Sequence, residues 1–69
     1  MTLEELRLEC GWTRNELARR ANVDFNTVNK ALTGNTISIS TAYKIASAIS
    51  QRLGRTIRFQ DIENLKVKT

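Results

Sequence analysis

The stretch Arg14 to Leu32, RNELARRANVDFNTVNKAL, decides the fold. Leu17, Ala18 and Ala21 have the spacing of one apolar face of a short helix. Asn22 follows directly, and asparagine tolerates the left-handed backbone that often ends a helix. We therefore expect a first helix that stops at Asn22.

A second helix is expected over Asp24 to Leu32, with Asp24 as its N-cap. Val28, Ala31 and Leu32 share one apolar face of this helix, and the opposite face is largely polar. Two short helices joined by a few residues form a helix-turn-helix, whose second helix can enter the major groove of DNA.

This pattern resembles the helix-turn-helix of the Cro and lambda-repressor (XRE-type) family of bacterial and phage DNA-binding proteins. The resemblance covers about Leu3 to about Ile49. Two features depart from the family pattern, because Leu32-Thr33 replaces a common polar pair and the following loop has no Pro. The residues that carry the resemblance are Ala18 at the helix crossing, Asn22 in place of the turn Gly, Leu17, Val23 and Val28 at buried positions, and Gly34 after the second helix.

The resemblance implies an all-α domain of four to five helices over residues 1–54. Residues 55–69 would form a C-terminal extension that packs on the core or on a second copy, so a homodimer is an open alternative. The implied function is sequence-specific binding of double-stranded DNA by a small transcriptional regulator, most often a repressor. The alternatives are an accessory DNA-binding factor of a mobile element, and an antitoxin or other protein-interaction module on the same fold.

Charge is distributed unevenly along the 69 residues, whose net charge is +4. Residues 1–16 carry four Glu and two Arg, residues 17–58 carry seven basic residues and one Asp, and residues 59–69 are balanced. Positive charge therefore gathers around and after the helix-turn-helix, as in a polyanion binder. A solvated surface is the alternative interpretation.

The polar face of the second helix supplies the base-contact candidates Phe25, Asn26, Asn29 and Lys30. Asparagine can make a paired contact with adenine, and lysine can donate to guanine acceptors. Phe25 either contacts a thymine methyl group or folds back over the edge of the core. Periodicity leaves both interpretations open.

Each residue that is predicted to contact DNA phosphates is proposed for a different reason. The resemblance implies that Arg14, in the first turn of its helix, contacts the backbone and braces the second helix. Loop residues Asn35 and Thr36 would contact phosphates as in the family, or form an ordinary polar turn. Thr27 would donate to a phosphate or simply lie at the surface. Lys44 would bind phosphate near the start of the last helix.

Three charged residues near these candidates are expected to contribute less to DNA binding. Asp24 would repel phosphates, but an N-cap oxygen is already occupied by backbone N–H groups. Arg19 and Arg20 are expected to lie on a solvent-exposed helix face.

The flanking elements are read from capping signals. A helix from about Thr2 to Cys10 should begin with a capping box between Thr2 and Glu5 and end at Gly11, and Thr13 with Glu16 has the same spacing. Trp12 should pack as a core residue.

The part of the chain after residue 33 is predicted to contain a loop, one longer helix and an irregular tail. Residues 34–40 are expected to be a loop that Ile37 and Ile39 anchor on the core, and a strand is not expected there. The last helix should run from a Ser40 cap to about Leu53. In the tail, Asp61 should cap one helical turn, and residues 65–68 alternate as in a strand.

Several function classes find no support in the sequence. There is no His, only Cys10 as a thiol, and no glycine-rich phosphate loop. We expect no enzyme, no cofactor or metal, and no small-molecule substrate. The chain has no signal peptide and no membrane-spanning apolar run, so a cytoplasmic, nucleoid-associated protein is expected.

Overall fold

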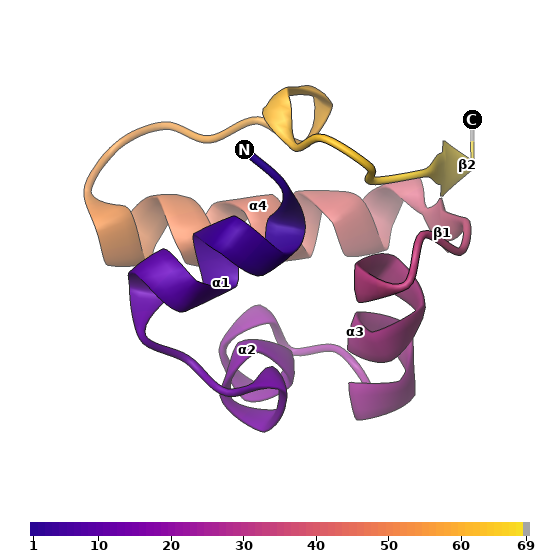
Figure 1. Ribbon diagram of the computed structural model, residues 1–69, viewed down its shortest axis with the longest axis horizontal. Coiled ribbons are helices and arrows are strands. Elements are labelled where there is room, and N and C mark those ends of the chain that lie inside the picture. Colours follow the sequence, from indigo (N-terminus) through magenta and orange to yellow (C-terminus); the bar gives the residue numbers. More distant parts are fainter. Residues whose placement is uncertain (69) are drawn as a thin grey trace.

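The computed structural model describes residues 1–68 and contains four α-helices, one 3-10 turn and two short strands (Figure 1). The helices enclose one core, and the strands lie together at one edge. In chain order the elements are α1 (Leu3–Cys10), α2 (Arg14–Ala21), α3 (Phe25–Leu32), β1 (Ile37–Ser38), α4 (Ile39–Leu53), η1 (Phe59–Asp61) and β2 (Val67–Lys68). The all-α expectation is confirmed.

Local capping explains where the first helices begin and end. The Thr2 hydroxyl accepts from the Glu5 N–H at 3.2 Å, and the Glu5 carboxylate accepts from the Thr2 N–H at 2.8 Å, so the expected capping box is present. Gly11 (φ 75°) and Asn22 (φ 58°) both adopt the left-handed backbone after their helices. Because the backbone N–H groups that follow bond back to the preceding helix, each helix ends at a specific residue.

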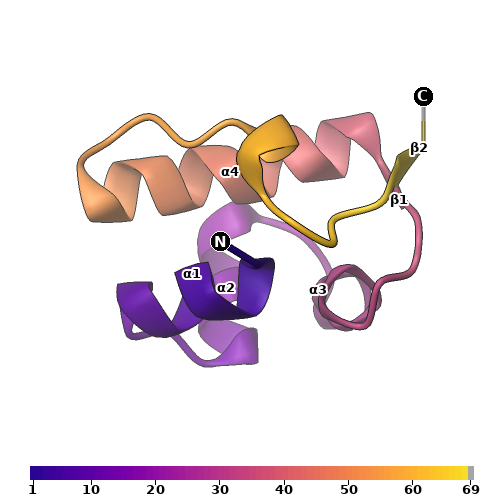
Figure 2. The ribbon, with the colours of Figure 1, turned by 45° about the horizontal axis from the view of Figure 1, so that its top comes forward.

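The core lies between α4 and the layer formed by the three shorter helices (Figures 1 and 2). Leu17, Val28, Ile45 and Ile49 are completely buried, and Trp12 is buried as predicted. Every residue of this core is apolar and no buried side-chain polar atom of the described residues lacks a partner, so burial of apolar surface stabilises the fold.

The expected loop over residues 34–40 is wrong in its second half. Ile37 and Ser38 form β1, which pairs in parallel with Val67 and Lys68 of β2. The Ile37 N–H donates to the Lys66 carbonyl at 2.9 Å. The strand covers only two of the alternating residues 36–40, since Ile39 and Ser40 belong to α4, and its partner strand comes from far along the chain.

Helix α4 starts earlier than predicted. Its N-cap is Ser38, whose hydroxyl accepts from the Thr41 N–H at 3.2 Å, and the expected cap Ser40 lies inside the helix. Ile39 is consequently the first helical residue and is 43% exposed, so it does not anchor the loop as expected, whereas Ile37 is buried. Gly54 ends the helix as predicted.

The tail folds back across the helices and reaches both β1 and the N-terminus (Figure 1). Ile62 is buried in the core, and Phe59 and Leu65 pack against it. The Glu63 N–H donates to the Met1 carbonyl at 2.9 Å. Asp61 is the last residue of the 3-10 turn η1, so the prediction that it caps a helical turn is wrong.

Candidate nucleic-acid interface

The outward face of α3 presents the predicted base-contact residues. Val28 and Ala31 turn into the core, which places Asn26 and Lys30 on the opposite, exposed side of the helix. Asn29 is half-buried at the edge of this face. Phe25 is 41% exposed and is not among the side chains packed against the core, so its ring is accessible at the first turn of α3.

Arg14 and Asn29 join the two helices of the motif. The Arg14 Nη1 atom donates to the Asn29 Oδ1 atom at 2.9 Å. Arg14 is the first residue of α2, and Asn29 lies in the middle of α3. The Arg14 guanidinium is exposed and makes no ion pair among residues 1–68, so it retains N–H donors that are open to solvent.

A groove brings two of the predicted phosphate contacts together. It has a volume of about 440 Å³ and lies where the end of α2, the start of α3 and the first turns of α4 meet. Thr27 and Lys44 contribute to its wall from α3 and α4 respectively. A hydroxyl and an ammonium group that line one groove are suited to an anionic oxygen.

Asp24 lines the same groove and differs from its predicted role. It occupies the N-cap position of α3 with extended backbone, but its side chain makes no capping hydrogen bond. The prediction that backbone N–H groups occupy the Asp24 carboxylate is therefore wrong. Asp24 also forms no ion pair among the described residues, so an exposed negative charge stands at the start of α3.

The loop after α3 is held by its own hydrogen bonds. Gly34 (φ 84°) adopts the left-handed backbone, and the Asn35 N–H donates to the Lys30 carbonyl at 2.8 Å. The Asn35 amide donates to the Thr33 hydroxyl, which donates in turn to the Asn29 carbonyl at 2.8 Å. Asn35 and Thr36 are thus exposed on a fixed turn beside the end of α3.

A family profile described as Helix-turn-helix matches residues 3–57, which is most of the chain. The chain belongs to the lambda-repressor-like helix-turn-helix family. It is a DNA-binding domain of the transcription-regulator type, whose ligand is double-stranded DNA. Comparison with curated proteins and with solved structures found no match.

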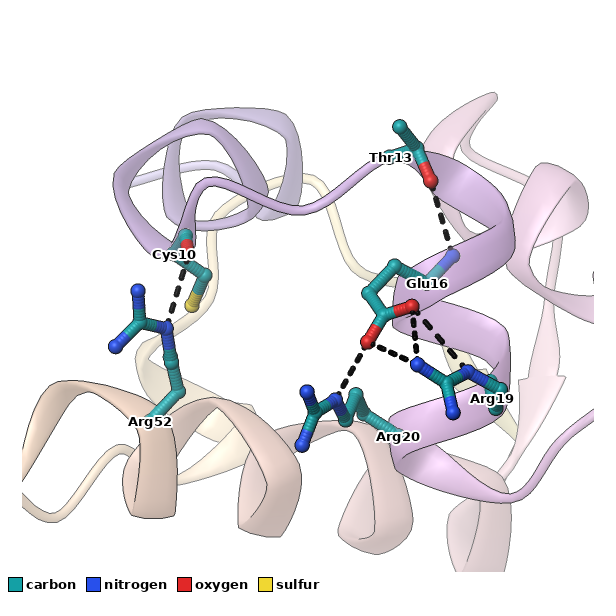
Figure 3. Close-up of polar contacts among 6 residues, drawn as sticks. All are labelled: Cys10, Thr13, Glu16, Arg19, Arg20 and Arg52. Carbon is teal, nitrogen blue, oxygen red and sulfur yellow. Dashed lines mark hydrogen bonds and ion pairs between the residues drawn. The ribbon is translucent and has the colours of Figure 1, made fainter.

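Within this helix-turn-helix domain, the single carboxylate of Glu16 forms ion pairs with two arginines of α2 (Figure 3). Glu16 accepts from Arg19 at 2.7 Å and from Arg20 at 2.6 Å. These hydrogen bonds hold the pKa of the Glu16 carboxyl below its ordinary range. The expected capping box is therefore only half formed, since the Thr13 hydroxyl accepts from the Glu16 N–H but the Glu16 side chain turns to the arginines.

Cys10 of the helix-turn-helix domain is a structural residue. It is 1% exposed, and burial raises the pKa of its thiol. Its carbonyl oxygen accepts from the Arg52 Nε atom at 3.1 Å, which ties α1 to α4 (Figure 3). The described residues contain no cluster of potential metal ligands, and none of their helices is long and apolar enough to span a bilayer.

Proposed function

We propose that this protein is a sequence-specific transcriptional repressor of bacterial or phage type that reads the major groove with α3. The observation that carries the proposal is the outward face of α3, where Asn26 and Lys30 are exposed and the Arg14–Asn29 hydrogen bond fixes the helix against α2. Side chains of a recognition helix specify bases when their positions are held by a rigid support.

The proposed contacts divide by chemistry. Asn26 would read adenine, Lys30 would donate to guanine, Asn29 would contribute its free amide N–H groups, and Phe25 would contact a thymine methyl group. The backbone contacts would set the register of the domain on the duplex without reading sequence. Those contacts are assigned to Arg14, Thr27, Asn35, Thr36 and Lys44.

The domain would repress transcription by occupying an operator and so blocking RNA polymerase. It would act in the cytoplasm, in association with the nucleoid. Binding as a homodimer would double the contact area and require an operator with two-fold symmetry. A small domain also gains stability from such association.

The test is selection from a random duplex pool by the whole protein across a range of salt concentrations, with sequencing of the bound fraction. An enriched motif, with affinity that falls linearly on a logarithmic salt scale, is the expected result. Two-fold symmetry in the motif would support the dimer. Absence of duplex binding at low salt would refute the proposal, and binding without enrichment would refute its sequence-specific part.

A further inference from the structure

Two lysines, Lys66 directly before β2 and Lys68 within it, lie beside the loop that follows α3. In the parallel pair Ile37 stands opposite Val67 and Ser38 opposite Lys68. Ile37 is buried and Val67 packs against the core, so the alternation of a strand places Lys68 on the outer face together with Ser38. Lys66, one residue before Val67, is also exposed, and its carbonyl oxygen accepts from the Ile37 N–H at 2.9 Å, so it lies beside the chain that follows Thr36.

These lysines carry free positive charge, unlike the arginines of the same tail. Arg55 pairs with Glu9 at 3.0 Å and Arg58 pairs with Asp61 at 3.4 Å. Lys66 and Lys68 are exposed, and no carboxylate among residues 1–68 lies within ion-pair distance of either. Both ammonium groups are therefore available to neutralise phosphates and to release the cations condensed on a polyanion.

The strand pair also places these two lysines at the same end of the molecule as α3, which we propose to be the DNA-reading helix. Both views place β1 and β2 at the end of the molecule that carries α3 (Figures 1 and 2). The hydrogen bond from the Ile37 N–H to the Lys66 carbonyl fixes β2 to the chain directly after Thr36. The family match ends at residue 57, so β2 lies outside the part of the chain that the family describes.

We propose that residues 66–68, which include β2, are a second phosphate-binding element, in which Lys66 and Lys68 contact the DNA backbone next to the phosphates reached by Asn35 and Thr36. The inference rests on the proposed DNA-binding function and extends its footprint to a segment that the helix-turn-helix lacks. These contacts would strengthen binding to every duplex equally, because phosphates carry no sequence information.

The experiment compares the parent protein with K66Q/K68Q and with the matched control R55Q/R58Q, which removes the same charge from paired arginines in the same tail. Affinity for a random duplex, and for a selected motif where one is found, is measured against salt concentration. We expect K66Q/K68Q to lower the salt slope by about 2 and to weaken binding to both duplexes by the same factor. R55Q/R58Q should leave the slope unchanged.

The outcomes separate this inference from the function on which it rests. If the parent binds duplex with a salt slope and K66Q/K68Q keeps that slope, or loses no more than R55Q/R58Q, the inference is wrong and the proposed function stands. If the parent binds no duplex at low salt, both are wrong. Thermal unfolding of the two variants should match the parent, because all four side chains are exposed.

Discussion

The Arg14 guanidinium donates to the Asn29 side-chain oxygen at 2.9 Å, so the two helices of the motif share a hydrogen bond at the edge of the face that we propose reads DNA. A paired contact with adenine requires both the oxygen and the amide group of an asparagine. Arg14 already occupies one acceptor position of the half-buried Asn29 oxygen, whereas Asn26 is exposed, so Asn26 is the better candidate for that contact.

Replacement of Arg14 should affect both backbone binding and recognition. R14A is expected to weaken binding to all duplexes and to lower the salt slope by about 1, through loss of one phosphate contact. It should also broaden the preference at the base pair nearest Asn29, whose side chain loses its support. R14K should keep the slope. An R14A slope equal to the parent slope would remove Arg14 from the phosphate contacts.

Replacement of Asn26 should relax specificity at one position. N26A is expected to cost about 1–3 kcal/mol on the preferred operator and much less on a random duplex, because only a base contact is lost. The measurement is selection and sequencing with both proteins. Q51A, which removes an exposed amide from α4, is the control and should recover the parent motif. An unchanged preference in N26A would contradict the assignment.

Replacement of Asp24 should increase affinity. Its carboxylate is exposed, makes no capping bond and lies in the groove with Lys44, so it opposes the approach of phosphate. D24N is expected to bind all duplexes more tightly, with little change in the free energy of unfolding, since asparagine is an equally good N-cap residue. D61N removes the same charge from the tail and should change affinity less. Equal affinities for D24N and the parent would show that Asp24 lies away from the backbone.

Replacement of Ile62 should test how firmly the tail is attached. Its side chain is 4% exposed, and I62A is expected to lower the free energy of unfolding by about 2–5 kcal/mol, a large share of the stability of a small domain. Urea denaturation measures the change. I39A is the matched control, because Ile39 is 43% exposed and its truncation should cost far less. Similar losses in the two variants would show that the tail contributes no more than a surface contact.

Acid should destabilise the domain through Glu16. The pKa of its carboxyl is held below 4.5 by hydrogen bonds from Arg19 and Arg20, so the unfolded chain binds this proton more readily than the folded one. The stabilisation is fully present above pH 4.5 and is lost as the pH falls through the folded-state pKa. E16Q should therefore show a shallower loss of stability than the parent as the pH falls below about 5, measured by chemical denaturation. Parallel curves would contradict this.

The helix-turn-helix could be predicted from the sequence because its signals are local. The Thr2–Glu5 capping box, the left-handed Asn22 and the apolar spacing of Leu17 and Val28 each depend on residues within one or two turns. Those signals predicted the first and last residues of α1, α2 and α3 to within about one residue.

Contacts between distant residues could not be predicted in the same way. The strand β1 depends on β2, whose pairing no periodicity in residues 36–40 can reveal. The Arg14–Asn29 bond depends on how two helices cross, although each residue was singled out separately. Asp24 shows a third limit, because a good N-cap residue need not turn its carboxylate to the backbone.

The pairing of Ile37 with Val67 bears on the order in which the domain folds. The contacts among α1, α2 and α3 join residues close in sequence and can form quickly, whereas closing the chain between Ile37 and Val67 costs more entropy and is expected to come later. A folding intermediate would then already contain α3 while the turn after that helix was still unsupported. In such an intermediate the amide protons of β1 would exchange with solvent faster than those of α2 and α3.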